Sequence, residues 1–151
     1  MPPTDDRVAA WRWLLLAHAA ALRAIEEDLS SAGTIPLSWY DVLLELNAAQ
    51  ERRLRMTELA ERVVLSRTRV SRLVDELVRK DLVERIPDPD DGRAAFATIT
   101  RRGRDELRRA APHYLAGIER HFTSLLADHE REVVAGALER VANHHRQLIR
   151  R

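Results

Sequence analysis

Cysteine is absent from this chain of 151 residues. Disulfides, thiolate nucleophiles and cysteine-based metal or redox sites are therefore excluded. The sequence also lacks a glycine-rich phosphate loop, a nucleophile elbow and any pair of carboxylates placed for acid and base catalysis. Its six histidines have no metal-ligand spacing: His144 and His145 are adjacent, and on a helix they point about 100° apart. We expect a protein that is not an enzyme and holds neither a metal nor another cofactor.

Long hydrophobic runs are scarce as well. The longest run near the start of the chain, from Trp13 to Leu22, contains a histidine and is about half the roughly 20 residues that span a bilayer. A secretory signal begins with basic residues and ends at a small-residue cleavage site, whereas the first 25 residues of this chain carry Asp5 and Asp6 ahead of a mixed amphipathic stretch. We therefore expect a cytoplasmic protein that does not bind membranes.

The composition is typical of a soluble, largely helical protein, with 45% hydrophobic and 32% charged residues. Its length predicts a single domain over residues 1–151. The overall charge of +1 conceals a segregation, because residues 1–49 carry −4, residues 50–109 carry +4 and residues 110–151 carry +1. A basic middle third is typical of nucleic-acid binding, although a solvated charged surface has a similar composition.

Apolar residues at spacings of three and four predict a long helix over residues 7–32. Its stripe is formed by Val8, Trp11, Leu15, His18, Leu22, Ile25 and Leu29. A second helix is predicted over residues 37–49, and Thr57 is a plausible N-cap for a short third one. Ser66 is then expected to cap a fourth helix that ends near Lys80, only a tight turn after the third.

The fourth helix is strongly amphipathic. Val70, Val74 and Leu77 lie on one face at 3.6 residues per turn, opposite a polar face. Hydroxyls and guanidiniums crowd its first two turns at Ser66, Arg67, Thr68, Arg69, Ser71 and Arg72. Cations at a helix N-terminus reduce helix stability but attract phosphate, and arginine donates bidentate hydrogen bonds to guanine. In a helix-turn-helix, this is the end of the second helix that enters the major groove of DNA.

Two strand-like runs follow, joined by the turn-forming sequence PDPDDGR, and they predict a β-hairpin with Arg93 near its tip. Such a hairpin can serve as a wing that reaches the minor groove. Thr100 is expected to cap a long helix that Pro112 kinks. Arg101 and Arg102 at the start of that helix are expected to contact phosphates. A last helix is predicted from Asp128.

The stretch MTELAERVVLSRTRVSRLVDELVRKDLVERIPDPDDGRAAFATITRRG resembles the winged-helix core of the MarR family of bacterial transcriptional regulators. The resemblance implies a mainly α fold with a small β-hairpin wing. Residues 37–100 would form the winged helix-turn-helix DNA-binding lobe, and residues 7–32 and 101–151 the helical dimerisation region. It also implies that Asp91 orients the wing and that Arg93 enters the minor groove of a pseudo-palindromic operator. Such a homodimer would bring together the terminal apolar stripes, which have too few partners within one chain.

Many members of this family respond to small aromatic or phenolic acids. The resemblance places a ligand cleft between the dimerisation helices and the DNA-binding lobe, where aromatic walls and a few polar groups suit such ligands. The candidate ligand-binding residues are Trp11, His18, Trp39, Tyr40, Asp41 and His113. A plain structural role is the alternative for His18, Trp39 and Tyr40. The sequence thus predicts a dimeric, ligand-responsive repressor; the alternative is a winged-helix protein-interaction module whose basic face binds an acidic partner.

Overall fold

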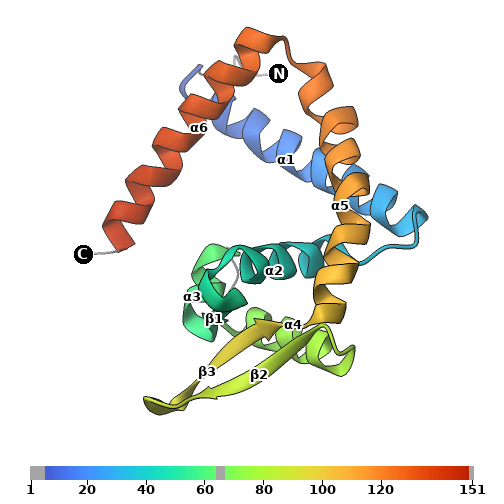
Figure 1. The fold of residues 1–151 in the computed structure, drawn as a ribbon. Coiled ribbons are helices and arrows are strands. Elements are labelled where there is room, and N and C mark those ends of the chain that lie inside the picture. Colours follow the sequence, from blue (N-terminus) through green and yellow to red (C-terminus); the bar gives the residue numbers. More distant parts are fainter. Residues whose placement is uncertain (1–5, 64–66, 150–151) are drawn as a thin grey trace.

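The computed structural model describes residues 6–63 and 67–149, with only the backbone of residues 6, 7, 67 and 145–149. The elements along the chain are α1 (Asp6–Ser31), α2 (Leu37–Ala48), η1 (Gln50–Arg52), β1 (Arg53–Arg55), α3 (Met56–Arg62), α4 (Arg67–Arg79), β2 (Val83–Asp88), β3 (Asp91–Ile99), α5 (Arg101–His121), η2 (Thr123–Leu125) and α6 (Asp128–Ile149). In Figure 1, α2 to β3 form a lobe below the three long helices α1, α5 and α6. The predicted mainly α fold with a β-hairpin wing is confirmed.

The lobe contains a small antiparallel sheet with the strand order β1-β3-β2. Strands β2 and β3 form the predicted hairpin, in which Arg85 lies opposite Ala97. Strand β1 pairs with the other edge of β3, where Leu54 also lies opposite Ala97. The sequence did not predict β1, because a strand of three residues with two arginines has little of the apolar alternation that marks a strand.

The core of the lobe lies between α2, α3, α4 and the sheet. It includes Val42, Leu43, Leu46, Leu59, Val70, Val74 and Leu77, none of which is measurably exposed. The apolar face predicted for α4 is therefore the face that packs into the core. Helix α3 begins at Met56, so Thr57 is not its N-cap; Arg55 holds that position, and its backbone N–H donates to Glu58 Oε2 at 3.2 Å.

A compact junction joins the end of α4 to the hairpin and α5. Asp81 ends the α4 segment in a left-handed conformation with φ 59°, and Leu82 N donates to Leu77 O at 2.9 Å. The Thr100 hydroxyl donates to Asp81 O at 2.7 Å and accepts from Gly103 N at 2.9 Å. The predicted N-cap of α5 is confirmed, and it also fixes α5 to the loop that follows α4.

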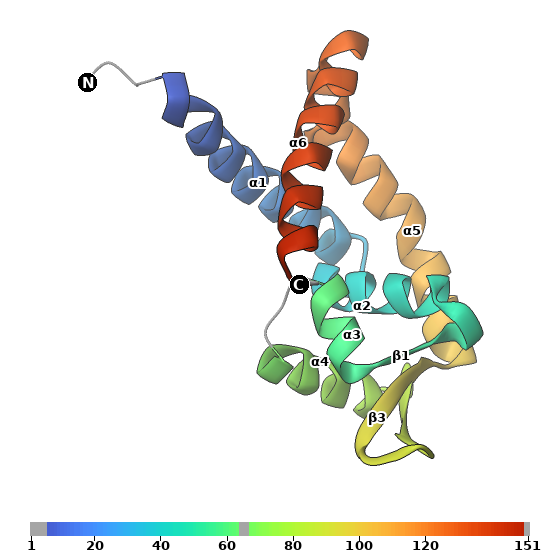
Figure 2. The same ribbon diagram turned by 90° about the vertical axis from the view of Figure 1, so that its left-hand side faces the viewer.

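Helices α1 and α5 lie above the lobe (Figures 1 and 2), and they cross in the view of Figure 1. Buried Ile25 of α1 packs at Gly117 of α5, where an added Cβ would lie 3.2 Å from Ile25 Cγ1. Asp28 Oδ2 binds both Arg120 Nη1 and His121 Nε2, each at 2.9 Å. The helix α5 is continuous through Pro112, which therefore does not end it.

The outer helices leave much apolar surface uncovered. The stripe predicted on α1 is buried at Ile25 and Leu29. Its N-terminal half stays largely uncovered by the described residues, since Trp11 is 62% and Leu15 49% exposed. Further exposed apolar side chains near the chain end are Leu115, Leu125, Val133 and Val141. Helix α6 turns back from α5 (Figure 1), and Arg131 Nη1 holds this corner by donating to Leu126 O at 2.7 Å.

Candidate nucleic-acid interface

The N-terminal half of α4 presents hydroxyl and guanidinium groups to solvent. Thr68, Arg69 and Arg72 are exposed, and the first turn contains no acidic residue. Arg72 has no ion-pair partner among the described residues of the chain. Ser66 lies outside the described residues, and Arg67 begins the helix without a described side chain. Because Val70 and Val74 anchor the opposite face, the exposed side chains point away from the core.

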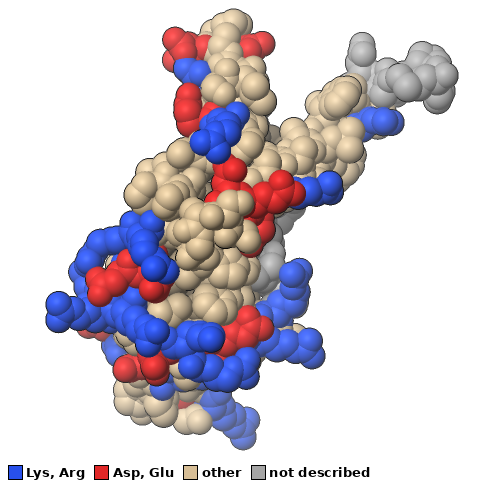
Figure 3. All heavy atoms as spheres, turned by 90° about the vertical axis from the view of Figure 1, so that its right-hand side faces the viewer, with Lys and Arg blue, Asp and Glu red and all other residues tan. Residues whose placement is uncertain are grey.

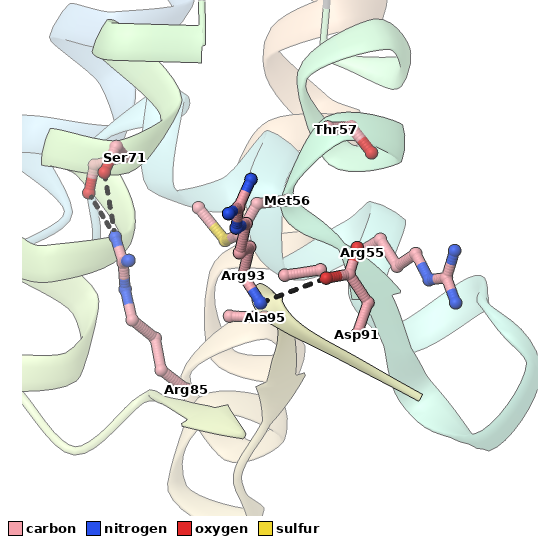
Figure 4. A pocket seen from close by; sticks show the side chains of 9 residues that line it. Arg55, Met56, Thr57, Ser71, Arg85, Asp91, Arg93 and Ala95 are labelled. Carbon is pink, nitrogen blue, oxygen red and sulfur yellow. Dashed lines mark hydrogen bonds between the residues drawn. The ribbon is translucent and has the colours of Figure 1, made fainter. Parts of the chain in front are cut away.

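The hairpin tip places a second cation beside α4. Arg93 is exposed near the start of β3, and its backbone N–H donates to Asp91 Oδ1 at 3.0 Å. Figure 4 shows Arg93 extending into the space between the α3 and α4 segments. The Asp91 carboxylate thus shapes the backbone at the tip, and its wing-orienting role stays a prediction.

An open groove of about 460 Å³ separates the hairpin from the two helices of the helix-turn-helix. Arg55, Met56, Thr57, Ser71, Arg85, Asp91, Arg93, Ala94 and Ala95 line it. The groove contains a contact of Ser71 that the sequence did not predict. Its hydroxyl accepts a hydrogen bond from Arg85 Nη2 at 3.0 Å, and the residue is only half-exposed (Figure 4). Ser71 is therefore engaged within the protein, whereas Thr68 and Arg72 face solvent.

A buried carboxylate fixes the hairpin from its other side. The side chain of Asp88 is only 1% exposed, and its Oδ2 lies 2.8 Å from Arg55 Nη2. The contact is an ion pair without the alignment of a hydrogen bond, since Asp88 Oδ2 has no hydrogen-bond donor among the described residues. Asp88 Oδ1 accepts from Asp90 N at 2.9 Å and so shapes the turn. A buried charge needs such partners, because its hydration is lost.

Positive charge gathers around the lobe and the start of α5. Figure 3 shows Lys and Arg atoms concentrated over the lower half of the molecule, while much of the upper half is uncharged. Arg101 is exposed, and Arg102 lies 3.8 Å from Asp81 with both side chains largely in solvent. Such exposed pairs are weak and exchange readily for phosphate. The placement of both arginines is compatible with the expected phosphate contacts.

The candidate ligand-binding residues are distributed over three helices. Trp11 and His18 are exposed on α1, and His113 of α5 lines a separate cavity of about 290 Å³ with Asp28 and Arg120. Trp39 of α2 is half-buried, and its Nε1 donates to Glu76 Oε2 of α4 at 3.3 Å. The structure therefore does not bring these four residues into one cavity within a single chain.

Tyr40 and Asp41 lie instead at the contact between α2 and α5. Tyr40 is buried, and its ring lies 4.4 Å from that of Tyr114, centroid to centroid. Loss of hydration, with the negative charges of Glu45 and Glu26, raises the pKa of Asp41 to about 6, although the residue as a whole remains exposed. Burial, together with the charge of Asp41, also raises the pKa of Tyr114. Two aromatic rings and a titratable carboxyl group thus adjoin here.

Residues 6–63 and 67–149 contain no group of three or more histidines and carboxylates placed to hold a metal ion. The sequence did not predict two features of the interface. Arg85 shares a strand face with buried Val83, and a charge on that face requires a polar partner, which was the available indication. The ion pair between Arg55 and Asp88 had no such indication, because it joins residues on separate strands.

A helix-turn-helix followed by an antiparallel hairpin, with exposed arginines on the second helix and at the hairpin tip, defines a winged-helix DNA-binding protein. The sequence model of the MarR family matches residues 34–94. The MarR family regulator AbsC from Streptomyces coelicolor is 32% identical and has a TM-score of 0.84, with 95% of this chain and 97% of AbsC covered. The chain belongs to the MarR family of transcriptional regulators, and it is a DNA-binding regulator rather than an enzyme.

Two further solved structures resemble it. Sco3205 from Streptomyces coelicolor, a MarR family regulator whose structure is a complex with DNA, is 28% identical with a TM-score of 0.84, over 93% of this chain and 89% of Sco3205. BpsR from Bordetella bronchiseptica, whose DNA binding is regulated by 6-hydroxynicotinic acid, is 16% identical with a TM-score of 0.81, over 93% of this chain and 97% of BpsR. At that identity, BpsR shows a shared fold alone.

Proposed function

We propose that this regulator is a homodimeric repressor that binds a pseudo-palindromic operator and is released by a small aromatic or phenolic acid. The observation that carries the dimer is the uncovered apolar surface of α1, α5 and α6, since monomeric soluble proteins rarely expose large contiguous apolar patches. A second copy of the chain would cover these faces around a two-fold axis. By length and composition alone, Val8–Ser31 is also apolar enough to cross a membrane. The α1 stripe that continues into the packed Ile25 and Leu29 favours a dimer in the cytoplasm instead.

A two-fold dimer would place its two α4 helices in successive major grooves. This arrangement requires half-sites about 34 Å apart, one turn of DNA, and therefore an inverted repeat. Thr68, Arg69 and Arg72, with Arg67 and Ser66 at the helix start, would contact base edges and nearby phosphates. Arg93 would enter the adjacent minor groove, and Arg101 and Arg102 would hold phosphates.

The ligand would act by favouring one separation of the two α4 helices over another. A ligand with equal affinity for both separations shifts nothing. The junction of α2 and α5, with Tyr40, Asp41 and Tyr114, supports an effector site near these helices because it combines aromatic rings with a carboxyl group. In the dimer, Trp11, His18, Trp39 and His113 would complete the cleft from α1, α2 and α5. The regulation of BpsR by an aromatic acid is consistent with this class of ligand.

Selection of genomic DNA fragments in the presence of competitor DNA tests the operator binding. We expect retention of fragments that share an inverted repeat, and retention that depends on charge alone would support the protein-interaction module instead. Titration of the retained complex with phenolic acids tests the release. A panel of acids that bind the free protein tightly and never dissociate the complex would refute the proposed regulation.

A further inference from the structure

We propose that Arg85 is a positioning residue for DNA recognition, which clamps the wing to the recognition helix and thereby sets the spacing between Arg72 and Arg93. The inference rests on the operator binding proposed above. Arg85 is exposed, and Figure 4 shows it extending from β2 toward the backbone and side chain of Ser71 on α4.

The clamp consists of three contacts made by one nitrogen atom. Arg85 Nη2 lies 3.0 Å from Ser71 O, 3.0 Å from Ser71 Oγ and 3.0 Å from Asp75 Oδ1. Ser71 and Asp75 are four residues apart, so they lie one above the other on the same side of α4. The guanidinium therefore holds one turn of the helix at two levels, and it resists both rotation and translation of α4 against the hairpin.

The position of the clamp explains why a small movement there would change the distance between Arg93 and Arg72. Arg85 lies opposite Ala97 in the hairpin, and Arg93 lies four residues further toward the tip. At about 3.3 Å per strand residue, the tip cation is some 13 Å beyond the clamp. Arg72 directly follows Ser71 on the helix, so its direction depends on how α4 is rotated. A small rotation at the clamp would displace Arg93 relative to Arg72, and the two cations have to enter neighbouring grooves of one duplex.

Arg85 could instead contact DNA directly. The effect of removing its partner Asp75 on DNA affinity distinguishes this role from that of a clamp. The side chain of Arg85 is 35% exposed, and its carboxylate partner Asp75 is 53% exposed. If charge alone mattered, removal of Asp75 would strengthen DNA binding, because an acid near the duplex repels phosphate. If the clamp matters, removal of Asp75 weakens operator binding. The two roles thus predict opposite signs for one substitution.

Operator affinity should be measured by fluorescence anisotropy for Arg85→Met, Asp75→Ala and the double variant, with Glu84→Ala as control. Glu84 precedes Arg85 on β2, is exposed and forms no side-chain hydrogen bond or ion pair with the described residues. We expect Arg85→Met to weaken binding about tenfold, as for the loss of a hydrogen bond to a charged group, and Asp75→Ala to weaken it by less, because the two contacts with Ser71 remain. The double variant should be no weaker than Arg85→Met, because Arg85→Met already removes the contact with Asp75. Tighter binding by Asp75→Ala would overturn the proposal.

The dependence of affinity on salt gives a second readout. A residue that contacts phosphate contributes about one unit to the slope of log K against log salt concentration. A clamp contributes none, so Arg85→Met should keep the slope of the unaltered protein while losing affinity. A slope reduced by about one would assign Arg85 to direct phosphate contact instead. Should Arg85→Met fail to fold, Ser71→Ala and Asp75→Ala, which leave the hairpin sequence intact, carry the same test.

The clamp can also be tested without DNA. Because the chain has no cysteine, spin labels at Thr68→Cys on α4 and Gly92→Cys in the wing would be the only ones in each chain. Nothing lies within 4 Å of an added Cβ at Gly92. Pulsed electron paramagnetic resonance should show a broader distance distribution in Arg85→Met than in the unaltered or Glu84→Ala background. An unchanged distribution would refute the clamp. A broadened distribution in Arg85→Met, together with no operator binding by the unaltered protein, would refute the proposed function and leave the clamp standing.

Discussion

Gly103 packs directly against the carbonyl oxygen of Leu82: an added Cβ at residue 103 would lie 2.2 Å from that oxygen. The same oxygen accepts a hydrogen bond from Thr100 N at 3.0 Å, so it cannot move away freely. This approach joins the start of α5 to the start of the wing. The position of the lobe relative to the upper helices therefore depends on a residue without a side chain.

Gly103→Ala should lower the free energy of unfolding by about 2 kcal/mol or more, because the clash with the backbone forces the junction apart. Chemical denaturation monitored by circular dichroism would measure the loss. Gly92→Ala is the control, since an added Cβ there meets nothing within 4 Å. Equal stability of the two variants would contradict the close packing at this junction.

Asp81→Gly should raise the free energy of unfolding by about 0.5 to 1 kcal/mol, because glycine adopts a left-handed conformation without the steric cost of a Cβ. Asp81 has φ 59°, and its pair with Arg102 is too exposed to contribute much. Gly33→Ala is the converse variant: with φ +66° at Gly33, it should destabilise the protein by about 1 kcal/mol. Thermal unfolding of both variants would check the opposite signs.

Asp41→Asn should stabilise the protein above pH 6 and have little effect below pH 4. The pKa of Asp41 is raised to about 6 in the folded protein, above its usual value of 3.8, so the stability that this group contributes is lost as the pH rises through that window. The gain should stay below about 1 kcal/mol, because Asp41 is exposed and solvent screens its charge. Unfolding free energies from pH 4 to 8 would test this, with Glu84→Gln as control. A gain that does not change with pH would contradict the raised pKa.

Leu15→Glu should convert the proposed dimer into a monomer, because it places a charge within the uncovered apolar surface of α1. Leu15 is already 49% exposed in the single chain, so the change removes little packing within it. Leu44→Glu on α2 is the matched control, since Leu44 is 40% exposed but lies on the lobe. Sedimentation equilibrium should give the dimer mass for the control alone. A dimer that withstands Leu15→Glu would exclude this part of α1 from the interface.

Much of the fold was predictable because it depends on local patterns. The spacing of Val70, Val74 and Leu77 indicated which face of α4 is buried, and Thr100 marked the start of α5. Strand β1 was missed, since its pairing with β3 depends on a partner about 40 residues away in the sequence.

The site was predicted less completely, because some of its contacts also join residues that are distant in the sequence. Exposed arginines on α4 and at the wing tip follow from amphipathic patterning and from the family motif. The contact that ties Arg85 to Ser71 follows from three-dimensional packing, so the sequence did not predict it, and the DNA contact of Ser71 stays a prediction. The separation of Trp11 and His18 from Tyr40 likewise reflects the path of α1, which its stripe of apolar residues does not specify.

The central claim is that α4 and the wing recognise DNA by sequence, and anisotropy titrations over a range of salt concentrations test it most directly. The proteins compared should be the unaltered chain, Arg72→Ala, Arg93→Ala and Arg108→Ala, whose native arginine pairs with Asp105 within α5 at 2.9 Å. We predict that affinity for a selected operator falls steeply with salt. We also predict that Arg72→Ala costs about 1–3 kcal/mol against the operator and far less against scrambled DNA, while Arg108→Ala behaves like the unaltered chain. Equal affinity of the unaltered protein for operator and scrambled DNA, or full operator affinity in both Arg72→Ala and Arg93→Ala, would contradict the account.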